Sequence, residues 1–98
     1  MKRAEALRKL RTFADALKAK GATSLYLFGS AAREEMGLTS DIDVFVDYDP
    51  HSRFSLLNMS GIRLIVMDEF NREVDITTRD SLHPLLRDKI LADAVRVL

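Results

Sequence analysis

Residues 41–47 read DIDVFVD, and this stretch decides the fold. Successive side chains of a β-strand point to opposite faces of a sheet, so strict alternation of apolar and acidic residues predicts a strand buried on one face. The two faces would carry Ile42, Val44 and Val46 on one side, and Asp41, Asp43, Phe45 and Asp47 on the other. The acidic face requires a chemical explanation, because charge inside a sheet is costly unless something neutralises it.

The acidic face lies within a wholly acidic segment. Residues 34–49 contain six carboxylates and no basic residue. Residues two apart on a strand lie roughly 6–7 Å apart on one face, so Asp41 and Asp43 would repel each other unless a cation lay between them. Oxygen ligands without cysteine or histidine favour a hard ion, so we expect Mg²⁺, with Mn²⁺ as a substitute.

A second acidic strand supplies a third carboxylate. Residues 72–78, REVDITT, alternate in the same way and place Asp75 opposite Val74 and Ile76. If the two strands are neighbours, Asp41, Asp43 and Asp75 would be able to hold two metal ions roughly 3.5–4 Å apart. That arrangement serves phosphoryl and nucleotidyl transfer.

The stretch SLYLFGSAAREEM, residues 24–36, predicts a buried strand followed by a tight turn and a short helix. Gly29 at the turn would let a ligand approach the backbone, and Ser30 is a plausible helix N-cap, with Gly37 as the stop. The start of a helix favours anions, and Arg33 would be able to reach a phosphate. We therefore expect Gly29, Ser30 and Arg33 to bind a nucleotide triphosphate.

The remaining elements are mostly helical. Apolar residues recur at helical spacing from Leu7 to Leu17 and predict one amphipathic helix over about 3–20. Residues 54–70 are ambiguous, because IRLIV (62–66) alone fits a buried strand as well as a helix. Their length and Asn71 as a C-cap favour a helix, and its apolar residues on several sides suggest burial on two faces. A last helix is expected over about 84–95, with VRVL ending as a short strand.

Composition excludes several protein classes. The chain has 98 residues, 47% hydrophobic and 31% charged, which is typical of one globular domain. Its formal net charge of zero argues against nucleic acid as a partner. The lack of cysteine fits a reducing compartment, and no segment reads as a signal peptide or as a bilayer-spanning run, so we expect a cytoplasmic protein without membrane contact.

Taken together, these motifs resemble a known family. Gly29-Ser30 followed after ten residues by Asp41-x-Asp43, with Asp75 on a later strand, is similar to the DNA polymerase β-type nucleotidyltransferase superfamily. Within it, GSAARxE, SDIDxxV and R-x-VDI-T resemble the minimal nucleotidyltransferases, which are antitoxin partners of HEPN-type toxins. The resemblance covers essentially the whole chain.

The resemblance implies a fold and an activity. The fold would be α+β, a small mixed sheet of three to four strands packed with about four helices, as one nucleotidyltransferase domain over residues 1–98 with its catalytic core at about 24–80. The activity would be Mg²⁺-dependent transfer of AMP from ATP to a hydroxyl, on a tyrosine of a HEPN-type toxin. Gly29 and Ser30 would bind the triphosphate, Asp41 and Asp43 both metals, and Asp75 the metal beside the attacking hydroxyl.

Other interpretations remain open. A second interpretation is an antitoxin that sequesters its toxin without catalysis, and a third is an enzyme that modifies a small molecule, as antibiotic nucleotidyltransferases do. The oligomeric state, including a homo-oligomer, is also open. Individual residues have simpler explanations: the basic residues of 1–20 as a solvated helix face, Asp47 and Asp49 as strand-end solvation, and His51 and His83 as exposed or capping histidines.

Overall fold

The computed structural model describes residues 2–33 and 41–98, which form a mixed sheet covered mainly on one face by helices. The strands are β1 (Ala22–Phe28), β2 (Ile42–Tyr48), β3 (Val74–Thr78) and β4 (Val95–Arg96). The helices are α1 (Arg3–Arg11), α2 (Ala14–Ala19), α3 (Gly29–Ala32), α4 (Leu56–Phe70), the 3₁₀ turn η1 (Arg79–Ser81) and α5 (Arg87–Asp93). The predicted α+β class, a small mixed sheet packed with helices, is confirmed.

The sheet has the order β3-β2-β1-β4, which makes β1 and β2 its central strands. β1 pairs antiparallel with β2 and with the short β4. β2 and β3 are parallel, and a parallel pair needs a long crossover connection, which α4 supplies. This connection sets the site, because it brings Asp75 of β3 beside Asp43 of β2 in the same register.

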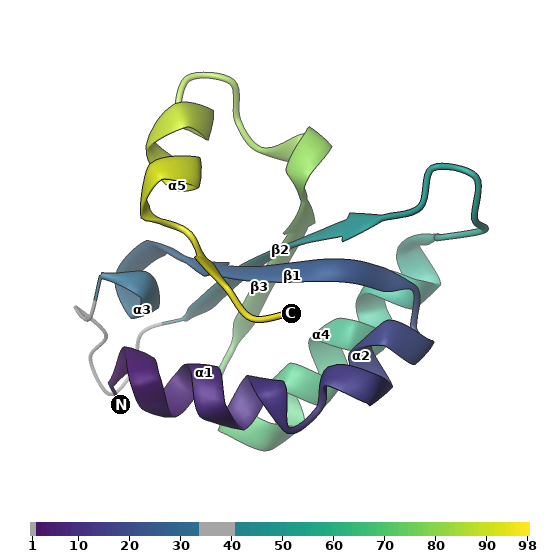
Figure 1. The fold of residues 1–98 in the computed structure, drawn as a ribbon, viewed down its shortest axis with the longest axis horizontal. Helices are drawn as coiled ribbons and strands as arrows, with labels where there is room; N and C mark the ends of the chain where they lie inside the picture. Colours follow the sequence, from purple (N-terminus) through teal and green to yellow (C-terminus); the bar gives the residue numbers. More distant parts are fainter. Residues whose placement is uncertain (1, 34–40) are drawn as a thin grey trace.

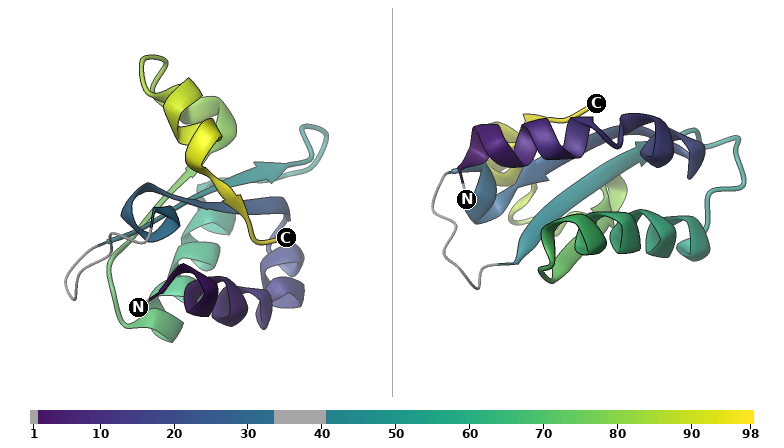
Figure 2. Two further views of the ribbon diagram at one scale, coloured as in Figure 1. Left: turned by 60° about the vertical axis from the view of Figure 1, so that its left-hand side comes forward. Right: turned by 90° about the horizontal axis from the view of Figure 1, so that it is seen from below.

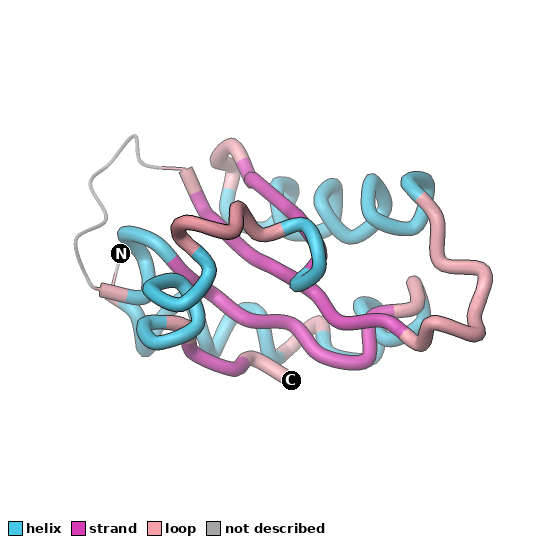
Figure 3. Tube along the Cα trace, turned by 90° about the horizontal axis from the view of Figure 1, so that it is seen from above, coloured by secondary structure: helices cyan, strands magenta, loops and turns pink. Residues whose placement is uncertain are grey.

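The two faces of the sheet differ in their cover. α1, α2 and α4 lie against one face, where the hydrophobic core forms (Figures 1 and 2). On the opposite face, η1 and α5 overlie only part of the strands (Figure 3). The core side carries Leu25 and Leu27 of β1 and, as the alternation predicts, Ile42, Val44 and Val46 of β2, all essentially unexposed.

Helix α4 confirms the helical interpretation of residues 54–70 and begins two residues later than predicted. Ser55 and Asn58 form a reciprocal capping box at its start. Asn71 ends it in the left-handed conformation, with φ 52°, as expected of an asparagine C-cap. The predicted IRLIV strand alternative is therefore excluded.

The expected burial of this helix on two faces is wrong for the isolated chain. Its buried residues Ile62, Val66 and Phe70 follow one stripe at i, i+4 and i+8. Leu57 and Leu64 lie outside that stripe and are 84% and 60% exposed. The helix is apolar on a second side, but no part of the described chain covers it.

The predicted single helix over 3–20 is in fact two helices. Thr12 and Phe13 interrupt it, and the Thr12 hydroxyl donates a hydrogen bond to the Lys9 carbonyl at 2.6 Å. The Phe13 amide bonds to Leu10, an i→i−3 bond that tightens the chain at the break. The break redirects α2 so that Leu17 also reaches the core.

The prediction that the basic residues of the N-terminal helix only face solvent is wrong for two residues of α1, which make contacts with distant parts of the chain. Arg11 donates to the carbonyls of Val97 and Arg96, which fixes the C-terminal strand against α1. Arg3 donates to the carbonyl of Ala32 at 3.1 Å and so holds the end of α3.

The C-terminal helix is shorter than predicted, because Pro84 lies in a turn and α5 begins only at Arg87. The residues after α5 form β4, which confirms a short strand within VRVL. In the part of the chain that the structure describes, no helix has both the length and the apolar character to cross a membrane.

Candidate active site

Asp43 and Asp75 lie side by side on the face of the sheet away from the core. They are register partners on parallel neighbouring strands, and such partners point to the same face roughly 4.8 Å apart. Both line a cavity of about 300 Å³ between the sheet and the segment from η1 to α5. Thr77, Ser81 and His83 add polar groups to its wall. The predicted proximity of these two carboxylates is therefore present.

Electrostatics at this pair are unfavourable for two negative charges. Burial raises the pKa of the Asp43 carboxyl above its ordinary value, and the charges of Asp75 and Asp41 raise the pKa further. The positive charge of Arg33 acts in the opposite direction. A cation bound between the carboxylates would remove this repulsion.

Position 29 requires a glycine, because Asp43 packs directly against its Cα. Its φ is +70°, a left-handed conformation that favours glycine. A Cβ atom added at Gly29 would overlap the Asp43 carboxylate. The sequence predicted Gly29 as an opening for a ligand, and the structure gives it the further role of leaving room for Asp43.

The donor chemistry of the carboxylates fits a hard divalent cation, because they offer several oxygen ligands. Without a cation, their negative charges repel one another. Among residues 2–33 and 41–98, however, no three acidic, histidine or cysteine side chains lie close enough to surround a metal ion. Asp41 is exposed and precedes β2. The set of Asp41, Asp43 and Asp75 as metal ligands thus stays a prediction, with one pair of its members in place.

Ser30 lies within α3, and Arg33 is the first residue after it. Ser30 is not the N-cap that was predicted, because the helix already includes Gly29. Arg33 lies 4.0 Å from Asp93 of α5 and lines a second cavity of about 240 Å³ together with Gly29 and Lys89. The predicted helix stop Gly37 and the acidic residues Glu34 and Glu35 lie outside the described residues.

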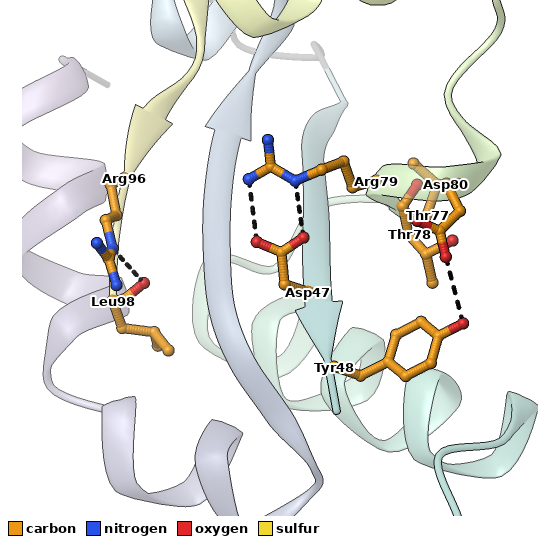
Figure 4. Close-up of polar contacts among 8 residues, drawn as sticks. All are labelled: Asp47, Tyr48, Thr77, Thr78, Arg79, Asp80, Arg96 and Leu98. Carbon is orange, nitrogen blue, oxygen red and sulfur yellow. Dashed lines mark hydrogen bonds and ion pairs between the residues drawn. The ribbon is translucent and has the colours of Figure 1, made fainter. Parts of the chain in front are cut away.

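Asp47 is held in an ion pair rather than solvated as predicted. Its two carboxylate oxygens accept hydrogen bonds from Arg79 at 2.8 and 3.0 Å (Figure 4). The Arg79 guanidinium also lies over the rings of Tyr26 and Phe45, at 5.0 and 5.1 Å from their centroids. The outward-facing Phe45 is fully buried, and its ring stacks with that of Tyr26, its partner across the β1–β2 pair.

Sequence reasoning missed two residues of the cavities, His83 and Lys89. The capping role expected of His83 is present, because its Nδ1 accepts a hydrogen bond from the Leu85 amide, but the ring also lines the cavity of Asp43 and Asp75. Lys89 lines the second cavity. No local signal marked either residue, because both depend on how α5 folds back over the sheet. His51, by contrast, is an exposed turn residue as expected.

Comparison with known families decides the class of this protein. The model of the nucleotidyltransferase domain matches residues 7–97. The chain belongs to this nucleotidyltransferase family. Its sequence is 43% identical over 72 residues to the Methanocaldococcus jannaschii protein named "Putative protein adenylyltransferase MJ0435", covering 74% of this chain and 75% of that protein. A second protein of that organism with the same kind of name, MJ1217, is 36% identical over 75 residues, 76% of this chain and 74% of its own.

Solved structures agree with this nucleotidyltransferase assignment. A structure described as a "putative minimal nucleotidyltransferase" superposes with a TM-score of 0.80 at 26% identity, covering 97% of this chain and 95% of that one. A structure described as a toxin-antitoxin with AMP-PNP has a TM-score of 0.69 at 16% identity, covering 90% and 72%. The second likeness, at this identity, concerns the fold alone.

Proposed function

We propose that this nucleotidyltransferase is a divalent-metal-dependent protein adenylyltransferase. It transfers AMP from ATP to a hydroxyl of a partner protein, a tyrosine of a HEPN-type toxin, and thereby acts as an antitoxin. Support for the adenylyl group and for a protein acceptor comes from the relatives, which are named protein adenylyltransferases. Support for a toxin partner comes from the motif resemblance and from the toxin-antitoxin structure with the same fold.

One observation carries the proposal: Asp43 and Asp75 face one cavity from neighbouring parallel strands, with Gly29 packed against Asp43. A carboxylate pair of this kind, beside a glycine turn, suits a reaction that binds a polyphosphate and activates a hydroxyl. The other aspartate on this face of β2, Asp47, is already paired with Arg79 and is not available for that chemistry.

In the proposed reaction the acceptor oxygen attacks the α-phosphorus of ATP. The bond between the α-phosphorus and the bridging oxygen breaks, and pyrophosphate leaves. Asp75 orients the acceptor hydroxyl and accepts its proton. Asp41 and Asp43 lie on the side of the bound nucleotide, where they would hold the metal that contacts its phosphates. Gly29 and Ser30 lie at the turn where the phosphates would pass. Mg²⁺, held by Asp41, Asp43 and Asp75, would supply charge neutralisation and a lower pKa for the attacking hydroxyl.

A second candidate function is sequestration of the toxin without catalysis. The observation in its favour is the uncovered apolar side of α4, where Leu56, Leu57 and Leu64 are 79%, 84% and 60% exposed. Exposed apolar groups of this kind are frequent at protein interfaces. Modification of a small molecule is the weaker alternative, because the names of the relatives specify a protein as the acceptor.

The two candidates are separated by weighing the partner protein. The chain is co-expressed with the product of its neighbouring gene, and both are weighed intact after addition of ATP and Mg²⁺. The proposal expects an AMP-sized mass increment on the partner with the wild-type chain and none with Asp75→Asn. A stable complex without any increment would overturn the enzymatic proposal and leave sequestration.

A further inference from the structure

The second cavity beside the carboxylates has the opposite charge character. It is lined by Gly29, Arg33, Lys89 and Asp93, with Phe28, Leu86 and Ile90 as its apolar wall. The cavity of Asp43 and Asp75 shares Phe28 and Ile90 with it. The two cavities therefore adjoin under α5, one with two aspartates and the other with two cations and one aspartate.

This arrangement of an acidic cavity beside a basic one suits an extended anion. One end of the anion would lie near metal held by the aspartates, and the other end would contact the protein cations. A nucleoside triphosphate carries roughly four negative charges, and carboxylates alone would repel it. Metal ions can neutralise only the phosphates near Asp43. The terminal phosphates need other positive groups, and the neighbouring cavity provides Arg33 and Lys89.

The two cations are not equivalent. Arg33 lies 4.0 Å from the Asp93 carboxylate, and its charge also acts on Asp43. Its charge is therefore partly used within the protein. Lys89 lies one helical turn before Asp93 on α5, and within the described residues its side chain has no hydrogen-bond or ion-pair partner. A lysine exposed at a cavity wall without a partner is free to turn its ammonium group toward an incoming anion.

We propose that Lys89 binds the β- and γ-phosphates of the nucleoside triphosphate, with Arg33 beside it, and thereby makes the site prefer a triphosphate over a monophosphate. This inference rests on the proposed function and names a further binding residue for it. The residue comes from the C-terminal helix, far in sequence from the Gly29 turn and the aspartates. α5 is then a part of the donor site and not only a cover for the sheet.

The test compares binding of two nucleotides, α,β-methylene-ATP and AMP, by titration calorimetry in the presence of Mg²⁺. The analogue is used because its α–β bond resists the transfer reaction. Lys89→Gln should weaken the triphosphate analogue at least tenfold, which corresponds to about 1.4 kcal/mol, and change AMP less than about twofold. Lys89→Arg should restore most of the affinity, since it keeps the charge.

Arg87→Gln is the matched control. Arg87 lies on the same helix, is exposed, carries the same charge and lines neither cavity. Its loss should leave both affinities within about twofold, which excludes a general effect of net charge. Thermal melting of all variants checks that they are folded.

Each other outcome decides against the assignment. If Lys89→Gln binds the analogue as wild type does, or weakens AMP equally, Lys89 does not bind the terminal phosphates, while the proposed function stands. If the wild-type chain binds no triphosphate at all with Mg²⁺ or Mn²⁺, the proposed function fails together with this inference.

Discussion

The two ends of the outward face of β2 carry one aspartate each, Asp43 and Asp47, in opposite electrostatic settings. Asp47 accepts two hydrogen bonds from Arg79, which itself lies over two aromatic rings. Asp43 faces Asp75 across the parallel pair, and its pKa is raised. The buried ring of Phe45 separates them.

The difference shows which negative charge the fold pairs with a cation of its own and which it places beside another carboxylate. Asp47 satisfies its charge within the chain and so contributes to stability. Asp43 and Asp75 repel each other in the isolated chain, an arrangement that costs stability and that the proposed binding of a cation and an anionic substrate would explain.

The largest expected effect is on catalysis by Asp75→Asn. Loss of this carboxylate removes the group that accepts the proton of the acceptor hydroxyl, a contribution made in the transition state. Transfer of AMP to the partner should fall by orders of magnitude, while binding of ATP and of the partner is kept. Intact mass of the partner measures transfer, and calorimetry measures ATP binding.

The antitoxin effect in cells sharpens the same prediction. An enzymatic antitoxin with Asp75→Asn should no longer protect cells, although it still co-purifies with its toxin. Full protection by this variant, with no mass increment from the wild-type chain, would show that Asp75 is not a catalytic residue and that the chain protects by binding.

The next effect is stabilisation by ligand. With Mg²⁺ or Mn²⁺ and ATP at about 100 times the dissociation constant, the free energy of unfolding should rise by about 2.7 kcal/mol. The double variant Asp41→Asn/Asp43→Asn should lose this gain, whereas Asp47→Asn should retain it. Thermal melting at millimolar ligand provides the measurement, and an unchanged wild-type melting temperature would count against a metal-nucleotide site at Asp43.

A smaller effect is expected on the stability of the ligand-free chain when the paired aspartate is changed. Asp47→Asn breaks the bidentate pair with Arg79, whose side chains are about one third exposed. The free energy of unfolding should therefore fall by only about 1 kcal/mol, as for a well-formed pair near the surface. Urea denaturation in EDTA checks this, and a variant as stable as wild type would mean that the pair contributes nothing.

The smallest expected effect is a gain in the free energy of unfolding, opposite to the loss expected for Asp47→Asn, and it depends on pH. Because the pKa of Asp43 is raised in the folded state, its charged form destabilises the folded chain at neutral pH. Asp43→Asn should therefore raise the free energy of unfolding by about 0.5 kcal/mol at pH 7 without metal. The gain should shrink as pH falls through the folded pKa, and vanish once both folded and unfolded states are protonated.

The pH series is read as the difference between wild type and Asp43→Asn, since other groups titrate equally in both. A loss of stability in Asp43→Asn at pH 7 in EDTA would contradict the repulsion between Asp43 and Asp75. It would also remove the contrast with Asp47.

The sequence alone determined the strands and the carboxylates of the candidate site. Period-two alternation marked β2 and β3, because it is a local property that burial of one face imposes. The same alternation placed Asp43 and Asp75 on the outward face, and the length of 54–70 with Asn71 indicated α4. The family resemblance added the two-metal chemistry, which no single motif specified.

Only the tertiary structure decided how charges are paired. Asp43 and Asp47 have the same local pattern, and their difference comes from Arg79, thirty-two residues beyond Asp47 in the chain. The exposure of the α4 leucines likewise depends on which segments pack against that helix. Lys89 reaches the second cavity only because α5 folds back over the Gly29 turn. Periodicity reports which face of an element is buried, but the partner of a charged side chain is set by contacts between segments that are distant in sequence.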